Sequence, residues 1–512
     1  MRELHPAKLF VPTLLGAAAL FLASSSGCSK PGSAPPPAAT GSAAAGARAT
    51  ARPFTGTSVT VAVPSDSPLA GHVKTSAAAW KEATGGEARV VETSAEEMKR
   101  KVSAGRGEFD VIVYPVTWAG DFMSEHHLRP FGTAEKTALD WDDVMPLCRD
   151  LLASWRGEAF AVPIDGEAVI VYYRLDLLRD KDNQALFKEK TGERLTAPRT
   201  WDDYRRIAEF FNGRDFTGDG QPDFGTVEPG TGEGSRGMAF LARAASYDKR
   251  GDGPALFFDS ETMEARIAEP AFVKALEDVI EIQKAGPPGM ASFSQREVRS
   301  EFLSGRAAMA LDGCDLATLT VDPERSKVKN QVGFALLPGS NRVFESETST
   351  WSESKAVHFA PYLAGGGWLV SVTAKSAKPS AAADFVACVA SKNATMAAVA
   401  ALGSPMTPFR AWHTSRVSDW TKLGFTGDSA RDYLTVVQAS QRHPNGVSDL
   451  RIPGWERYAR VLETAFARAL SNEAPAAEAL ETAAAEWNAI TAEIGKDRQR
   501  SAYRDSLGNL PD

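Results

Sequence analysis

The sequence predicts an α/β protein with two lobes, each built around its own sheet, joined by several passages of the chain. Three observations support this fold class. The chain has 512 residues, of which 43% are hydrophobic, so it exceeds the size at which one core stops growing. Apolar strands alternate with helical stretches, which favours parallel sheet. At 161–178 a Pro-marked extended segment runs through an acidic turn into a β-rich block, as expected where the chain passes between lobes.

The N-terminal stretch has the pattern of an export signal. Basic residues precede the apolar run 9–23, which is too short to cross a bilayer at about 1.5 Å per residue. Small residues at 25–27 stand directly before Cys28 and resemble a bacterial lipobox, with Ser25 where Leu is usual. The resemblance implies that 1–27 are removed and that Cys28 carries lipid. Plain secretory cleavage is the alternative.

Residues 28–57 are expected to form a tether, because Ala, Pro, Gly and Ser dominate and cannot build a core. Beyond the tether, Cys148, Cys314 and Cys388 allow at most one disulfide, and their spacing does not identify it. No Cys/His cluster indicates zinc, and no cofactor is expected to be required. The formal net charge of -8 offers no basic field, so nucleic acid is excluded as a partner and a membrane is contacted only through the anchor.

The first lobe begins with predicted strands at 58–63, 88–92 and 109–113, separated by helices at 72–83 and around 96–100. Ligands of open α/β sheets sit beyond the carboxyl ends of strands. The candidate ligand contacts selected by this rule are Ser65 and Asp66 after the first strand, and Tyr114, Thr117 and Trp118 after the third. For the two aromatic residues, packing between strand and helix is an equal alternative.

The second lobe is predicted from a buried strand at 168–173 and from a helix that Thr200 caps, with acids in its first turn. An amphipathic helix follows at 270–284. The run 301–313 contains F-x-x-G-x-A-A-M and predicts a helix end, a Gly turn and a strand. A further strand and turn are expected at 332–339.

Two more passages between lobes are expected at 365–372 and 404–410, and helices at 379–390 and 476–494. In their order and spacing, 161–178, 198–204 and 301–313 resemble the extracellular solute-binding proteins of ABC transporters, specifically the large carbohydrate-binding group that includes maltose-binding protein. The resemblance covers nearly all of 58–495.

This resemblance implies a two-lobed periplasmic-binding-protein type II fold with hinge crossings. The implied domains are lobe 1 at 58–164 plus 369–409, lobe 2 at 165–368 plus 410–497, and a tail at 498–512.

The resemblance also implies ligand contacts. Glu167 and Glu228 fall where the family carries sugar-contacting acids, although a turn carboxylate that caps the backbone is the alternative for Glu167. Asp315 stands where the family places an aromatic residue near the ligand, a departure that argues against maltose specificity. Trp368 is placed close to the cleft. Trp455 is the best local match for an aromatic that stacks on a sugar ring, and Tyr458 is the alternative in a shifted register.

The segment 215–223 reads DFTGDGQPD and matches the spacing of a calcium loop. Its twelfth position is Thr226 rather than a bidentate Glu. The hypothesis is a structural Ca²⁺, and the alternative is a turn without an ion. The candidate ligands are the side chains of Asp215, Thr217, Asp219 and Asp223 and the carbonyl of Gln221.

Together these observations predict an extracytoplasmic, lipid-anchored protein, monomeric, that captures a mono- or oligosaccharide between its lobes and delivers it to the permease subunits of an ABC transporter. We expect no enzymatic activity. The alternatives are a secreted glycoside-acting enzyme and a ligand sensor on the same fold. A glycoside hydrolase needs two acids at a fixed separation, and the sequence identifies no such pair and neither G-x-S-x-G nor H-E-x-x-H.

Overall fold

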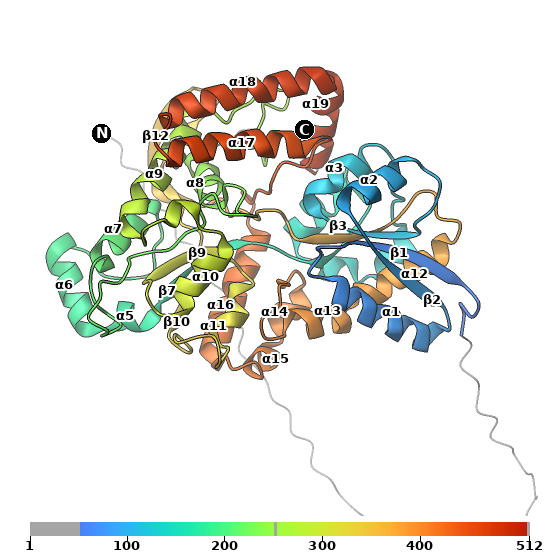
Figure 1. Ribbon diagram of the computed structural model, residues 1–512, viewed down its shortest axis with the longest axis horizontal. Helices are drawn as coiled ribbons and strands as arrows, with labels where there is room; N and C mark the ends of the chain where they lie inside the picture. The colour runs from blue at the N-terminus through green and yellow to red at the C-terminus, as the bar shows by residue number, and fades with distance from the viewer. Residues whose placement is uncertain (1–51, 250–252, 509–512) are drawn as a thin grey trace, which may run out of the picture. The chain divides into compact units, whose positions relative to one another are not determined.

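The computed structural model describes residues 52–249 and 253–508. Ala51–Asp512 form one compact unit, in which two sheets make the centres of two lobes (Figure 1). This arrangement confirms the predicted fold class. The predicted signal segment and Cys28 lie outside the described residues. No helix in the described part combines the length and the hydropathy needed to cross a bilayer.

The sheet of lobe 1 has the strand order β2-β1-β3-β13-β6. β1 is parallel to β2 and to β3, whereas β13 is antiparallel to β3 and β6. The middle of the sheet reads as a continuous apolar run because both of its faces are covered: Val111, Ile112 and Val113 are fully buried. The strands are β1 (Ser58–Pro64), β2 (Glu87–Thr93), β3 (Val111–Pro115), β6 (Val162–Asp165) and β13 (Trp368–Val372).

Helices α1 (Ala70–Thr84) and α12 (Pro379–Val389) pack against each other beside this sheet, and α2 (Ala95–Ser103) contacts β1. The chain ahead of β1, predicted as the end of the tether, is packed as well. The ring of Phe54 stacks on Trp80 with centroids 5.6 Å apart. The ordered lobe therefore begins before residue 58, because an aromatic residue near the end of the Ala/Pro-rich segment finds an apolar partner.

Lobe 2 is built on the antiparallel sheet β10-β7-β9. A second small sheet, β12-β11-β8, contains an exposed hairpin that the sequence did not predict. Helix α7 begins as predicted, since the Thr200 side chain accepts from the N–H of Asp203. The elements are β7 (Val169–Arg174), β8 (Asp248–Lys249), β9 (Met309–Gly313), β10 (Val332–Leu336), β11 (Ser340–Glu345), β12 (Thr350–His358), α7 (Trp201–Phe211), α10 (Gln295–Leu303) against β9 and α16 (Gly427–Arg442) against β10.

Three passages of the chain meet where the two lobes join. The first leads from β6 in one sheet to β7 in the other, and the second enters β13 through 363–367. The third is held to the first, because Gly166 pairs with Thr407 in an isolated bridge. The passages are packed so closely that glycine is required: Gly367 has φ +78°, and a Cβ there would lie 2.6 Å from the Asp165 carbonyl oxygen.

The C-terminal helices are α17 (Trp455–Leu470), α18 (Ala476–Ile494) and α19 (Lys496–Ser506). The first two pack on each other and on α9 (Pro270–Ile282) (Figure 1). The predicted tail is largely α19. Its Tyr503 is buried and its hydroxyl accepts from the Phe257 N–H at 3.1 Å, while Arg498 pairs with Glu125. The sequence did not show this packing because α19 is mostly polar and buries few of its side chains.

The other α-helices and short strands complete the two lobes. They are α3 (Ala119–Met123), α4 (Thr133–Ala138), α5 (Leu175–Arg179), α6 (Lys181–Thr191), α8 (Met238–Tyr247), α11 (Leu316–Thr320), α13 (Lys392–Val399), α14 (Ala411–Ser415), α15 (Val417–Thr421), β4 (Ser154–Trp155) and β5 (Glu158–Ala159).

Candidate functional site

A cavity of about 290 Å³ lies where the passages meet, and both lobes contribute to its wall. The walls come from the ends of β3, β6 and β9, from α10, from the Gly-rich loop before α8 and from the segment that enters β13. We call it the interlobe cavity. Its lining residues are Pro115, Asp165, Glu167, Gly234, Ser235, Arg236, Met238, Gln295, Arg299, Asp315, Tyr362, Ala364, Gly365, Gly367, Trp368, Pro405 and Asp449.

One wall of the interlobe cavity carries three acids. Asp165 ends β6, and its carboxylate accepts from the Thr407 N–H at 2.7 Å. Glu167 follows in the turn before β7 and accepts from the Ala168 N–H at 3.1 Å. Asp315, just after β9, reaches the same place: a Cβ on Gly313 would lie 2.9 Å from Asp315 Oδ1 and 3.0 Å from Glu167 Oε1. The end of β9 is a glycine, which leaves this space open.

Burial raises the pKa of both Asp165 and Glu167 well above the ordinary range. For Glu167, the neighbouring charges of Asp315 and Asp165 raise the pKa further. Burial also raises the pKa of Asp315, although the nearby guanidinium of Arg299 opposes that shift. The ionised acids therefore repel one another in a poorly hydrated wall. A hydrogen-bond donor on a ligand would stabilise their charged form.

Helix α10 supplies the two polar residues that support this wall. Arg299 donates to Asp312 at 2.8 Å and to Asp315 at 2.7 Å, and Gln295 donates to Asp312 at 2.6 Å. Gln295 and Arg299 are one helical turn apart and therefore share a face. The sequence analysis missed both. The available signal was their spacing just ahead of the F-x-x-G-x-A-A-M run, on the helix that leads into β9.

Arg236, Tyr362 and Asp449 form another part of the cavity lining. The Tyr362 hydroxyl donates to the Asp449 carboxylate, whose pKa is raised by burial. Arg236 has φ +46° in the Gly-rich loop before α8, and its guanidinium lies over the ring of Trp455 at 5.2 Å. Arg236 and Asp449 also line a smaller apolar cavity that contains Trp455 and Trp487, so these two polar residues separate the two spaces.

Of the predicted ligand residues, Glu167, Asp315 and Trp368 line the interlobe cavity, and Trp455 lines the smaller cavity beside it. Asp66 is exposed in the turn after β1 and lies outside both linings. The placement of Tyr114 follows the packing alternative, since it is fully buried within lobe 1 and its hydroxyl hydrogen-bonds to Ser371 at 2.9 Å.

Trp118 and Glu228 also lie outside the two linings. Trp118 is buried under Lys99, whose ammonium lies 4.7 Å from the ring centroid. Glu228 is almost completely buried and receives both guanidinium nitrogens of Arg243, at 2.9 and 2.7 Å. Its carboxylate is thus satisfied by the protein itself. The ligand roles assigned to residues from sequence remain predictions.

The loop predicted to bind calcium satisfies its own acids. The carboxylate of Asp215 accepts from the N–H groups of Gly218, Asp219 and Gly220. Asp223, completely buried, accepts from two further loop N–H groups. Arg306 lies 3.2 Å from an Asp219 oxygen. The carboxylates do not converge, and no group of three or more acidic, His or Cys side chains suited to a metal occurs among the described residues. This arrangement fits a turn without an ion better than a calcium loop. Bound calcium remains a hypothesis.

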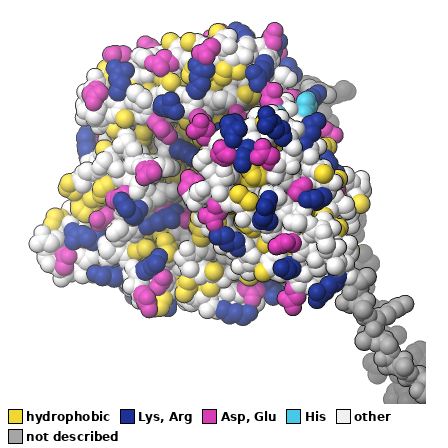
Figure 2. Space-filling view, turned by 45° about the vertical axis from the view of Figure 1, so that its right-hand side comes forward, with side chains coloured by type: hydrophobic (Ala, Val, Ile, Leu, Met, Phe, Trp, Pro, Cys, Tyr) yellow, Lys and Arg dark blue, Asp and Glu magenta, His cyan; other side chains and the backbone are white. Residues whose placement is uncertain are grey.

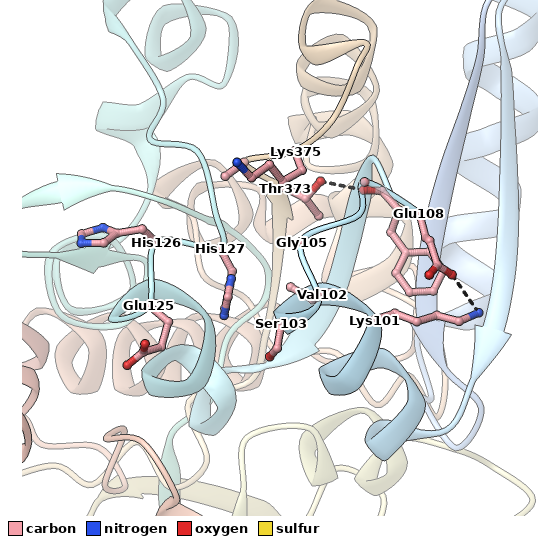
Figure 3. A pocket seen from close by; sticks show the side chains of 13 residues that line it. Lys101, Val102, Ser103, Gly105, Glu108, Glu125, His126, His127, Thr373 and Lys375 are labelled. Atoms are coloured by element: carbon pink, nitrogen blue, oxygen red, sulfur yellow. Dashed lines mark hydrogen bonds and ion pairs between the residues drawn. The ribbon is translucent and has the colours of Figure 1, made fainter. Parts of the chain in front are cut away.

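A different cavity, of about 330 Å³, lies at the other end of the lobe 1 sheet (Figure 3). It opens beside the start of β3 and the residues after β13. Two interactions in its lining are internal to the protein: Lys101 pairs with Glu108, and the Thr373 hydroxyl donates to the Phe109 carbonyl. On the face seen in Figure 2, acidic and basic side chains are interspersed without a patch of one sign.

Two sheets joined by several passages, with a polar cavity at the junction, define a two-lobed ligand-binding protein. The chain belongs to the family of bacterial extracellular solute-binding proteins, whose sequence pattern matches residues 72–396, more than half of the chain. The family resemblance found in the sequence is thereby confirmed.

One similar protein is named for the compound that it binds. A mannitol-binding protein of Pseudomonas aeruginosa is 28% identical over 253 residues, which are 49% of this chain and 52% of that protein. The chain thus matches about half of the relative's length.

Solved structures share the fold at lower identity. A solute-binding protein of Agrobacterium radiobacter K84 in complex with ribitol has TM-score 0.62 and 20% identity, over 86% of this chain and 100% of that one. One of Agrobacterium vitis S4 with bound D-mannitol has TM-score 0.60 and 21% identity, over 86% and 99%. Maltose-bound MalE3 of T. maritima has TM-score 0.61 and 20% identity, over 85% and 100%.

Proposed function

We propose that this protein captures a small carbohydrate, a sugar or a sugar alcohol, in the interlobe cavity and delivers it to the permease subunits of an ABC transporter. The observation that carries the proposal is the cavity itself, which is lined by the acids Asp165, Glu167 and Asp315 together with Arg236, Asp449 and Trp368. Relatives named for mannitol, ribitol and maltose support this ligand class.

The lining suits a polyhydroxylated molecule. Carboxylates accept hydrogen bonds from hydroxyl groups, while the guanidinium groups and the Ser235 hydroxyl can donate to them. An aromatic ring such as that of Trp368 offers an apolar surface to the C–H face of a sugar. The three passages allow one lobe to turn against the other, which is how periplasmic binding proteins close around ligands.

An extracytoplasmic location follows from the family. Lipid attachment at Cys28 would hold the protein at a bacterial membrane, and we propose that it acts there as a monomer without catalytic activity. A Cys28→Ala variant tests the anchor: the protein should move from the membrane fraction to the soluble fraction after cell disruption. Unchanged membrane association would argue against lipidation at this residue.

The ligand class is tested by a thermal-shift screen followed by calorimetry with sugars, oligosaccharides and sugar alcohols, including mannitol and ribitol. We expect saturable binding of at least one member, with the ligand recovered unchanged by chromatography. A released product would instead support the glycosidase alternative, which the raised pKa of Glu167 beside Asp165 and Asp315 keeps relevant. Absence of binding across the screen would reject the proposal.

A pair of glycine substitutions locates the site. Gly313→Ala places a methyl group against the oxygens of Asp315 and Glu167, so it should weaken ligand binding at least several-fold. Gly71→Ala is the matched control, because a Cβ there meets no atom within 4 Å, and its affinity should equal that of the unmodified protein. Equal affinity of Gly313→Ala would place the ligand elsewhere.

A further inference from the structure

The interlobe cavity has more acids than cations. Its lining contains four carboxylates and two guanidinium groups. Among the described residues, no Lys, Arg or His nitrogen forms an ion pair within 4.0 Å of Asp165, Glu167 or Asp449. Asp165 is only 4% exposed. Buried carboxylates ordinarily have a charged partner or several donors, so this wall lacks a cation that proteins usually supply.

Neither of the two arginines in the lining acts as a cation partner for Asp165 or Glu167. Arg299 is bound to Asp312 and Asp315 through three hydrogen bonds, and Asp312 is itself completely buried. Arg236 lies over the ring of Trp455, and together with Asp449 it also lines the smaller cavity. The guanidinium of Arg299 is therefore already shared between Asp312 and Asp315, and it forms no ion pair with Glu167 or Asp165.

The geometry beside Gly313 brings two acceptor oxygens close together. Asp315 Oδ1 and Glu167 Oε1 both approach the position that a Cβ on Gly313 would occupy, and Gln295 Nε2 lies 3.6 Å from it. Each of Asp165 and Glu167 receives one backbone N–H, which leaves further lone pairs on both carboxylates. The part of the chain described here gathers no metal-binding group of three or more such side chains, which favours an organic cation over a bare metal ion.

We propose that the ligand carries a protonated amino group, as in an amino sugar or an amino polyol, and that Glu167 receives this group together with Asp165 and Asp315. The inference rests on the proposed carbohydrate-binding function and narrows its ligand class. An ammonium group has three donors, whereas a hydroxyl has one, and charge-assisted hydrogen bonds are stronger than neutral ones. The amino group supplies the positive charge that this wall lacks.

The test compares ligands that differ only at one position. Calorimetry at pH 7 and low ionic strength would measure mannitol against 1-amino-1-deoxymannitol, and glucose against glucosamine. In at least one pair, we expect the amine to bind tenfold or more tightly than its hydroxyl counterpart, and to lose part of this advantage at high salt. Equal or weaker binding of both amines, with a neutral member bound, would overturn this inference alone. Binding of none of the four compounds, nor of any other member of the screen, would overturn the proposed function with it.

A charge-neutral variant separates the amine contact from general polarity. Glu167→Gln keeps the shape of the side chain, so we expect the affinity ratio of amine to hydroxyl ligand to fall at least tenfold. Glu486→Gln, on the exposed face of α18, removes the same charge and should leave the ratio unchanged. Melting temperatures of both variants check folding. An unchanged ratio in Glu167→Gln would overturn the assignment.

The pH dependence gives a readout that a neutral hydrogen bond would not produce. The charged groups that act on Glu167 are Asp165, Asp315 and Arg299. The buried titratable groups near it are Cys148, Cys314, Tyr362 and Tyr433. Amine binding favours the ionised acids, so it should release protons and strengthen from pH 5 to pH 7. Proton release is measured by repeating the calorimetry in buffers of different ionisation enthalpy, and none or uptake would contradict the proposal.

Discussion

Two acids at family-like positions, Glu228 and Glu167, lie in opposite electrostatic surroundings. Glu228 is sealed inside lobe 2 with the guanidinium of Arg243, which also lies 4.2 Å over the ring of Trp201. Glu167 stands in the cavity wall beside two other acids and has no cation of its own within ion-pair distance among the described residues. The comparison indicates that the fold neutralises Glu228 itself, whereas Glu167, which lines the interlobe cavity, has no such partner.

The largest effect is expected from breaking the Glu228 pair. Arg243→Met keeps much of the aliphatic volume but leaves Glu228 buried without its partner, so the variant should lose about 3–5 kcal/mol of unfolding free energy. Urea unfolding measures the loss. The control is Arg100→Met, which removes an exposed ion pair with Glu97 and should leave the unfolding free energy nearly unchanged. Similar costs for both variants would mean that Glu228 is not a structural acid.

The second prediction concerns stability against pH at Glu167. An acid whose pKa is raised in the folded state binds more protons folded than unfolded, so stability falls as pH rises from the unfolded pKa, about 4.3 for Glu, toward the folded value. Glu167→Gln removes this contribution, and its stability curve should fall less steeply above about pH 4.3. Asp165 and Asp315 keep their own contributions. The two curves of stability against pH are measured by thermal unfolding in matched buffers. If they run parallel, the pKa of Glu167 is not raised in the folded protein.

The sequence could predict what local chemistry determines. The strand at 58–63, the cap at Thr200 and the passage at 161–178 each carry their signal within a few residues, and the structure has them. The distinction between Glu167 and Glu228 was not accessible in this way, because Arg243 lies on a different element from Glu228. The cavity walls draw residues as distant as Glu167, Arg299 and Asp449 together. Such long-range pairings leave no local pattern.

The β11–β12 hairpin is a part of the fold that could not be predicted from local sequence either. β12 is largely exposed along its nine residues, so it lacks the alternation of buried and exposed positions by which a half-buried strand is found in a sequence. Only its pairing with β11, from Ser340 to His358, makes it a strand.

The third prediction compares aromatic residues. Trp368 lines the interlobe cavity, so Trp368→Ala should weaken ligand binding by about 1 kcal/mol or more. Trp351→Ala, in the β12 hairpin, removes a tryptophan that is also partly buried and should not change affinity. Calorimetry with the best ligand of the screen gives both values. Equal affinity of Trp368→Ala and the unmodified protein would remove this ring from the binding site.

The smallest effect is expected at the Asp215 loop, which repeats the contrast between satisfied and unsatisfied acids. Asp215 accepts from three backbone N–H groups, which lower its pKa, and the guanidinium of Arg306 lies against Asp219. Because these oxygens already have donors, chelator or added Ca²⁺ should leave the melting temperature unchanged. A transition that falls with chelator and recovers with Ca²⁺ would show that the carboxylates turn toward an ion, and Asp223→Asn should then abolish that response. In either case, the melting temperature shows whether a carboxylate that already accepts backbone hydrogen bonds can still bind a cation.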